Sequence, residues 1–180
     1  MEQIIYNMLS ELQNGNNHVR GLSKLLKVNH MTIQRRMKEL ENLNIVDYTT
    51  EGRNKIYFIK NTIESRNALH AMEYWKLTQL LETYQKLRLT IEKIIYNKKI
   101  PLAIIFGSYA KHAATRKSDI DLYIETSNPE IKRQIQDIDS QLSIKIGKFD
   151  ATGPLAKEII KTHVIIKGVE RYYELIHQNA

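Results

Sequence analysis

The spacing of apolar residues changes along this 180-residue chain, and the changes divide it into three zones. Residues 1–60 open with apolar residues three and four positions apart, which is the spacing of amphipathic helices. Residues 61–98 contain no proline or glycine and predict one long linker helix. Residues 99–180 carry short apolar runs between turn residues, which is typical of a small sheet with helices. We therefore expect an α+β protein with one domain on either side of a linker helix.

The first zone predicts three helices followed by a β-hairpin. Turn residues at 14–17 separate the first two helices, and Asn29 is a suitable N-cap for the third. Two strand-like runs, 45–50 and 55–60, are joined by a short loop that contains glycine. This order, and above all the pattern of residues 25–46, resembles the winged helix-turn-helix family. The resemblance covers about a third of the chain and implies a DNA-binding domain at residues 1–60.

The third predicted helix carries side chains suited to nucleic acid. If Ile33, Met37 and Leu40 form its buried stripe, Arg35 points directly away from the core. Arginine and glutamine read base edges, and lysine and arginine also bind phosphates. An alternative is that the domain contacts only proteins. The predicted DNA contacts are Gln34, Arg35, Arg36 and Lys38 on the helix, with Arg53 and Lys55 on the hairpin.

The charge of the chain is unevenly distributed. The net charge of the chain is +7, and the first hundred residues account for +6 of it. A basic N-terminal part suits a polyanionic partner such as DNA. The other interpretation is an ordinary solvated surface.

An apolar seam runs along the second half of the predicted linker helix. Its residues alternate at spacings of three and four, as in a heptad repeat, but for only about two and a half heptads. Two interpretations stay open, namely packing against the neighbouring domain and formation of a homodimer. The seam consists of Leu77, Leu80, Tyr84, Leu87, Ile91 and Ile94.

The third zone combines a Gly-Ser turn with a pair of aspartates. Gly107 and Ser108 follow the apolar run 102–106 and open a short predicted helix, whose free N–H groups can bind phosphate. Asp119 and Asp121 are two positions apart in a predicted strand, so both carboxylates face one side. Adjacent carboxylates repel unless a cation lies between them. Their oxygen ligands suit Mg²⁺ or Mn²⁺.

Two basic residues lie between the Gly-Ser turn and the aspartates. Lys111 and Arg116 could neutralise the phosphates of a bound triphosphate. They could equally be exposed charges of a loop.

The order of Gly107-Ser108, ten residues and Asp119-Ile120-Asp121 resembles the minimal nucleotidyltransferases of the DNA polymerase beta superfamily, over residues 99–180. The resemblance implies a nucleoside triphosphate substrate, a divalent metal and release of pyrophosphate. It also implies a third carboxylate on a later strand, where Asp150 is the only acid in the segment 144–150. Asp150 is either this metal ligand and catalytic residue, or a turn residue.

The acceptor of the nucleotide is open. In this superfamily it is a protein side chain, a small molecule or an RNA end, and antitoxins with this motif modify a partner toxin. A toxin is therefore one candidate partner. The alternative function is a nucleotide-sensing or antitoxin-type transcription regulator with little or no transferase activity.

Several classes of protein are excluded by composition. The chain has no cysteine, which excludes disulfides, thiolate metal sites and a cysteine nucleophile. No apolar run approaches the roughly 18 residues of a membrane span, and the N-terminus lacks the pattern of a signal peptide. We therefore expect a cytoplasmic protein that does not act at a membrane.

Overall fold

The computed structural model describes residues 2–177 and divides the chain into two compact units. Unit 1 is Met1–Met72 and unit 2 is Glu73–Ala180. Each unit has its own cluster of buried apolar side chains. Within residues 2–177, no helix has the length and apolar character needed to cross a membrane.

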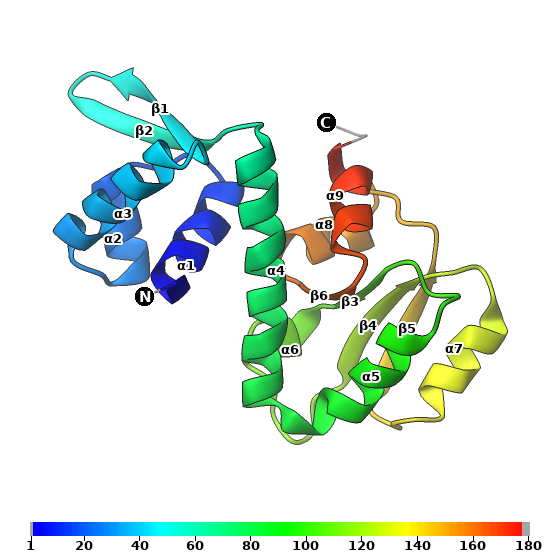
Figure 1. Ribbon diagram of the computed structural model, residues 1–180. Coiled ribbons are helices and arrows are strands. Elements are labelled where there is room, and N and C mark those ends of the chain that lie inside the picture. The colour runs from blue at the N-terminus through cyan, green and yellow to red at the C-terminus, as the bar shows by residue number, and fades with distance from the viewer. Residues whose placement is uncertain (1, 178–180) are drawn as a thin grey trace. The chain divides into compact units, whose positions relative to one another are not determined.

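Unit 1 contains three helices and a hairpin, in the order that the sequence predicts, followed by the first part of α4 (Ile63–Thr83) (Figure 1). The Asn29 side chain caps the third helix by accepting a hydrogen bond of 2.8 Å from the Met31 N–H. The core includes Met8, Leu22 and Met37, each fully buried. The elements are α1 (Glu2–Gln13), α2 (Val19–Leu26), α3 (His30–Asn42) and the antiparallel strands β1 (Val46–Glu51) and β2 (Asn54–Ile59).

The segment 61–98 is not one helix, and the prediction of a single long linker helix is wrong at Tyr84. The backbone of Tyr84 (φ −124°, ψ 69°) leaves the helical region. The Tyr84 hydroxyl accepts a hydrogen bond of 3.2 Å from the Ala114 N–H, and the centres of the Tyr84 and Tyr109 rings are 4.8 Å apart. Contacts distant in sequence therefore accompany the break. The elements are α4 (Ile63–Thr83), the short 3₁₀ helix η1 (Gln85–Leu87) and α5 (Arg88–Tyr96).

The apolar seam packs inside unit 2. Leu80, Leu87, Ile91 and Ile94 are at most 3% exposed, and Leu77 and Tyr84 pack against the same cluster. The packing interpretation of the seam is confirmed, and these four side chains are not available to form a dimer. The boundary between the units falls within α4, whereas the predicted division was 1–60, 61–98 and 99–180.

Unit 2 is built on a four-stranded mixed sheet with helices, as predicted (Figure 1). The strand order is β5-β4-β3-β6. Strand β3 is antiparallel to both β4 and β6, and β4 is parallel to β5. The strands are β3 (Ala103–Ile105), β4 (Ile120–Glu125), β5 (Leu142–Gly147) and β6 (Val164–Lys167). Besides the second part of α4, η1 and α5, the helices of this unit are α6 (Gly107–Ala110), α7 (Pro129–Gln136), α8 (Pro154–Lys161) and α9 (Val169–His177).

The two faces of β4 have different surroundings. Ile120, Leu122 and Ile124 point into the main apolar cluster and are at most 1% exposed. On the opposite face the ring of Tyr123 lies 5.5 Å from that of Phe149, which in turn lies 6.1 Å from Tyr172. Asp121 shares this second face, because residues two apart in a strand point the same way.

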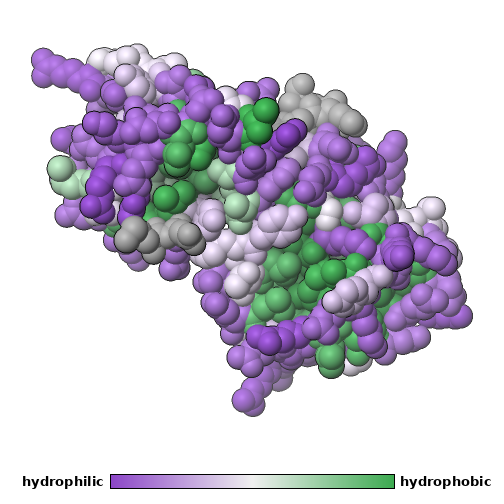
Figure 2. Space-filling view, viewed as in Figure 1, coloured by the Kyte–Doolittle hydropathy of each residue, from purple (hydrophilic) through white to green (hydrophobic). Residues whose placement is uncertain are grey.

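Figure 2 shows that the surface of the molecule is mainly hydrophilic in that view, with apolar side chains gathered in patches.

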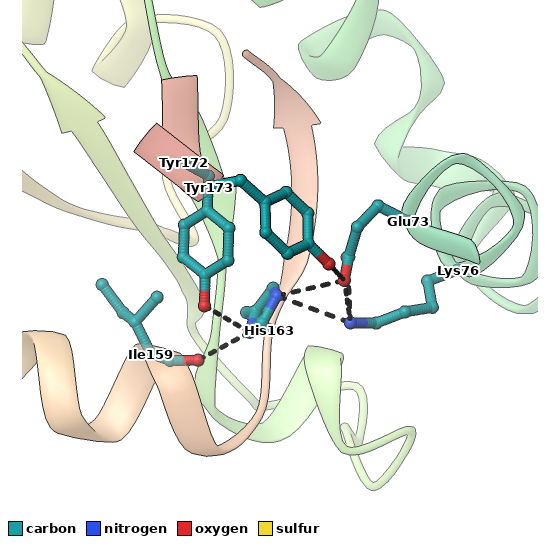
Figure 3. A network of polar contacts seen from close by, with 6 residues as sticks. All are labelled: Glu73, Lys76, Ile159, His163, Tyr172 and Tyr173. Atoms are coloured by element: carbon teal, nitrogen blue, oxygen red, sulfur yellow. Dashed lines mark hydrogen bonds and ion pairs between the residues drawn. The ribbon is translucent and has the colours of Figure 1, made fainter. Parts of the chain in front are cut away.

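A buried polar network lies within unit 2 (Figure 3). The Glu73 carboxylate is fully buried and lies 2.9 Å from the Lys76 ammonium and 3.5 Å from His163 Nε2. His163 Nδ1 lies 2.8 Å from the Ile159 carbonyl oxygen, and the Tyr173 hydroxyl donates to Glu73 over 3.4 Å. Burial alone would raise the pKa of Glu73, but His163 and Lys76 outweigh it and hold the pKa below its usual value. The network joins α4, α8, α9 and the residue that precedes β6.

Candidate active site

Gly107 and Asp121 are in contact, which brings the two halves of the motif together. The Phe106 N–H donates a 3.0 Å hydrogen bond to the Asp121 carbonyl oxygen, so the end of β3 is fixed beside β4. Gly107 then adopts a φ of +68°, a conformation that favours glycine. A Cβ at Gly107 would lie 2.2 Å from Asp121 Oδ2. Only glycine allows the carboxylate to lie this close to the turn.

The helix that follows Gly107 is a single turn. Tyr109 and Ala110 are buried in the unit 2 core and anchor it, whereas Ser108 is half-buried. The Lys111 N–H closes the turn by donating to the Gly107 carbonyl oxygen over 3.2 Å. Such a short helix has little macrodipole. Phosphate binding here would therefore depend on the backbone N–H groups and on the Ser108 hydroxyl.

The two motif aspartates differ in exposure. Asp119 is exposed and lies directly before β4, and Asp121 is half-buried within it. The residues between and after them, Ile120 and Leu122, point to the core. This is the alternation that the sequence predicts for a strand with both carboxylates on one face.

Asp121 lies in an environment that disfavours its charge. Its pKa is raised, first because of burial and then because the Glu158 and Asp119 carboxylates repel it. The ammonium of Lys145 and a hydrogen bond from Ser143 oppose this shift without cancelling it. An additional cation beside Asp121 would relieve the repulsion.

The donor set fits a divalent cation that arrives with a phosphate ligand. Among residues 2–177, no group of three or more histidine, aspartate or glutamate side chains is arranged to hold a metal ion. The protein would supply carboxylate oxygens from Asp119 and Asp121, and the remaining ligands would come from phosphate oxygens and water. Mg²⁺ is commonly bound in this way, through one or two carboxylates and substrate phosphates.

Asp150 lies beyond the end of β5 and is fully exposed. Its carboxylate accepts hydrogen bonds from the Thr152 hydroxyl (2.7 Å) and the Thr152 N–H (3.0 Å), and these bonds lower its pKa. The arrangement is that of a turn residue before α8, the second of the two interpretations of Asp150. Its role as a third metal ligand or catalytic residue stays a prediction.

Three side chains that the sequence did not single out lie around Asp121. Ser143 is its partner across the parallel β4–β5 pair, and Lys145 is two residues further along β5 on the same face. Glu158 comes from α8. The first two could have been found by aligning the predicted strands in parallel, but sequence periodicity gives no indication of where Glu158 lies.

Lys111 and Arg116 are both exposed in the segment that joins the two motif halves. The segment is ordered by a turn in which the Ser118 N–H donates to the Thr115 carbonyl oxygen over 3.2 Å. The Arg116 carbonyl oxygen also accepts a hydrogen bond of 3.0 Å from the Gln141 side chain. Both cationic side chains are thus accessible to an anion, and their phosphate-binding role stays a prediction.

The predicted DNA contacts of unit 1 are mostly exposed. Gln34, Arg35 and Lys38 lie on the solvent side of α3. Arg36 differs from the prediction, because it is only 8% exposed and forms a 2.5 Å ion pair with Glu39. It follows Ile33 by three residues and precedes Leu40 by four, so it falls on the buried side of the helix.

The hairpin of unit 1 also presents positive charge. Arg53 and Lys55 are both exposed. The Lys55 ammonium lies 3.6 Å from the centre of the Tyr48 ring, so a cation–π contact places it over β1.

Comparisons with known proteins agree with the arrangement in unit 2. A search of curated proteins finds no match. Among protein families, one match spans Gly107, Ser108, Asp119 and Asp121 together with the strands β3 to β6. Residues 89–171 match the family described as polymerase beta nucleotidyltransferase, and this match supports a nucleotidyltransferase domain in the second half of the chain.

Proposed function

We propose that unit 2 transfers a nucleoside monophosphate from a nucleoside triphosphate to an acceptor. The observation that carries this proposal is the contact between Gly107 and Asp121, where a Cβ would lie 2.2 Å from the carboxylate oxygen. This contact joins the turn that opens α6 to the start of β4, where Asp119 directly precedes the strand and Asp121 lies within it. Phosphate and metal would therefore be held side by side, which nucleotidyl transfer requires.

The residues around this contact take complementary roles in the proposal. Ser108 and the backbone N–H groups of the turn bind phosphate oxygens, and Lys111 and Arg116 neutralise further charge. Asp119 and Asp121 hold Mg²⁺ or Mn²⁺, which when bound would neutralise the triphosphate and favour ionisation of the acceptor. Asp150 is the candidate third metal ligand or general base. Its carboxylate is exposed and can therefore be reached by a bound ligand.

The proposed reaction is a displacement at phosphorus. An oxygen of the acceptor forms a bond to the α-phosphorus and loses its proton. The bond between the α-phosphorus and the bridging oxygen breaks, and pyrophosphate leaves with the electron pair. Candidate acceptors are a protein side chain, including that of a partner toxin, a small molecule and an RNA end.

The transfer is tested by incubating the full chain with α-labelled nucleoside triphosphates, Mg²⁺ and a cell lysate. We expect label to appear on one acceptor class, and pyrophosphate to be released in equal amount. Asp121→Asn should lose this transfer and keep its fold, because the substitution removes a charge that is already disfavoured. If the wild type transfers no label to any acceptor, the enzyme proposal is wrong.

A nucleotide-sensing regulator is the second candidate, favoured by the place of Asp150. Its carboxylate is engaged with Thr152 in a turn, and the partner of Asp121 on β5 is Ser143 and not an acid. A sensor would bind triphosphate without transferring it. Asp150→Asn separates the candidates, because loss of transfer with binding retained would make Asp150 catalytic and the protein an enzyme.

We further propose that unit 1 is a winged helix-turn-helix domain that binds duplex DNA. Three helices followed by an antiparallel hairpin support this, as do the exposed side chains of Gln34, Arg35 and Lys38 on α3. The hairpin adds Arg53 and Lys55. In this proposal α3 reads the major groove and the hairpin contacts the DNA backbone.

A further inference from the structure

Strand β5 places a lysine beside the aspartate pair. Strands β4 and β5 are parallel, with Asp121 opposite Ser143 and Tyr123 opposite Lys145. Partners in a ladder point to the same face, so Asp121, Ser143 and Lys145 share one side of the sheet. Ile144, which points the other way, is buried in the unit 2 core and fixes the position of the strand.

The ammonium of Lys145 is available to an external anion. Lys145 is exposed, and it takes part in none of the ion pairs formed between the described side chains. It is nevertheless close enough to Asp121 to influence that carboxyl. A cation beside the motif without an ion pair is suited to a ligand that brings negative charge into the site.

We propose that Lys145 contacts a phosphate group of the bound nucleoside triphosphate, which extends the phosphate site from the Gly107 turn to strand β5. This inference rests on the proposed function of unit 2. A lysine cannot coordinate a metal as an acid in its place would, but it binds phosphate oxygens as a point charge. Lys145 also differs from Lys111 and Arg116. The backbone of Lys145 is held in strand β5, whereas Lys111 and Arg116 lie in the segment that connects the two halves of the motif.

The test is calorimetry of the full chain with Mg²⁺ and inorganic tripolyphosphate, which carries the phosphates without a base. We expect Lys145→Ala to weaken binding about tenfold, which corresponds to the loss of one charge-assisted contact. Lys145→Arg should retain most of the affinity. Lys132→Ala, which removes an exposed lysine of α7, is the matched control and should bind as the wild type does.

A second pH separates direct contact from an effect through Asp121. If Lys145 only favours ionisation of Asp121, the defect of Lys145→Ala should disappear at the higher of the two values pH 6.5 and pH 8.5, because an acid with a raised pKa ionises more completely as the pH rises. Direct contact predicts that the defect is as large at pH 8.5 as at pH 6.5. A defect that disappears at pH 8.5, or that is absent at both values, overturns the inference and leaves the proposed function standing. A wild type that binds neither tripolyphosphate nor any nucleoside triphosphate overturns both.

Discussion

Gly107 combines two constraints that other residues cannot meet together. Its φ of +68° disfavours any side chain, and a Cβ would lie 2.2 Å from Asp121 Oδ2. We expect Gly107→Ala to destabilise the protein by about 1–3 kcal/mol and to displace the carboxylate. Denaturant unfolding measures the first effect, and Mg²⁺-dependent binding of triphosphate, which should be lost, measures the second.

Gly52 provides the matched control for Gly107. It also has a positive φ, of +60°, but nothing lies within 4 Å of the place its Cβ would take. Gly52→Ala should therefore cost only backbone strain, about 1 kcal/mol, and leave triphosphate binding unchanged. If Gly107→Ala bound Mg²⁺ and triphosphate as well as Gly52→Ala does, the proposed site would be in the wrong place.

Asp121 makes stability depend on pH in the absence of metal. Its pKa in the folded protein is raised, so ionisation favours the unfolded state, and the stability present at low pH is lost as the pH rises through this pKa. Asp121→Asn should therefore raise the melting temperature in EDTA at pH 7. The difference should shrink as the pH falls through the acid range, because the aspartate then becomes protonated in both the folded and the unfolded state.

Asp150 provides the opposite case. Its folded pKa is lowered by the Thr152 hydrogen bonds, so its contribution is present at neutral pH and is lost as the pH falls through the acid range. Asp150→Asn should lower the melting temperature at pH 7, or leave it unchanged.

A lower melting temperature for Asp121→Asn at pH 7 in EDTA would contradict the described electrostatics.

The polar network around Glu73 connects α4 to the end of α8. The carboxylate is fully buried, and Lys76, His163 and Tyr173 surround it (Figure 3). Glu73→Gln removes the charge but keeps the size, so it should destabilise the protein by about 2–4 kcal/mol, because Lys76 loses its partner. Chemical denaturation measures this.

Glu82 is the control for Glu73 on the same helix. It is exposed, and Gln79 donates a hydrogen bond of 2.8 Å to it. Glu82→Gln should change the free energy of unfolding by less than about 0.5 kcal/mol. Equal effects of the two substitutions would show that the network contributes no stability of its own.

Local periodicity predicted most elements but not the long-range contacts between them. The strand at 102–106 is predicted by an apolar run before a turn and the strand at 119–125 by alternation of apolar and polar residues, and the structure has β3 and β4 there. The break at Tyr84 was missed, because its contacts with Ala114 and Tyr109 are distant in sequence. Arg36 flanks the predicted stripe of Ile33, Met37 and Leu40, and the structure places it on the buried side of α3.

The site was predictable only where strand alternation or a short motif encodes it. Gly107, Ser108, Asp119 and Asp121 follow from such patterns. The position of Lys145 beside Asp121 depends on the parallel register of β4 and β5. The position of Glu158 near Asp121 depends on how α8 packs within unit 2. Neither is encoded in local spacing.

For the whole molecule, the net charge of +7 suits the proposed DNA partner. We expect the full chain to bind duplex DNA with an affinity that falls steeply with salt, because neutralised phosphates release counterions. Arg35→Ala should weaken binding about tenfold, which is a typical loss for one base-edge contact. Fluorescence anisotropy at several salt concentrations measures both effects.

Two controls accompany the DNA measurement. Lys93→Ala removes one exposed positive charge from α5 in unit 2, outside the proposed interface, and should leave binding nearly unchanged. Arg36→Ala should act mainly on stability, because its side chain is buried. Absence of DNA binding even at low salt would contradict the proposed role of unit 1.

The proposed function of unit 2 requires binding of a nucleoside triphosphate together with a divalent cation at the Gly107–Asp121 contact. Its most direct test is calorimetric titration of the full chain with each of the four ribonucleoside triphosphates, with Mg²⁺ and with EDTA. We expect Mg²⁺ to tighten the binding of at least one triphosphate, and we expect Asp119→Asn and Asp121→Asn to abolish this metal dependence while the fold is kept. The proposal is contradicted if no triphosphate binds in the presence of Mg²⁺, or if Asp121→Asn binds with the same metal dependence as the wild type.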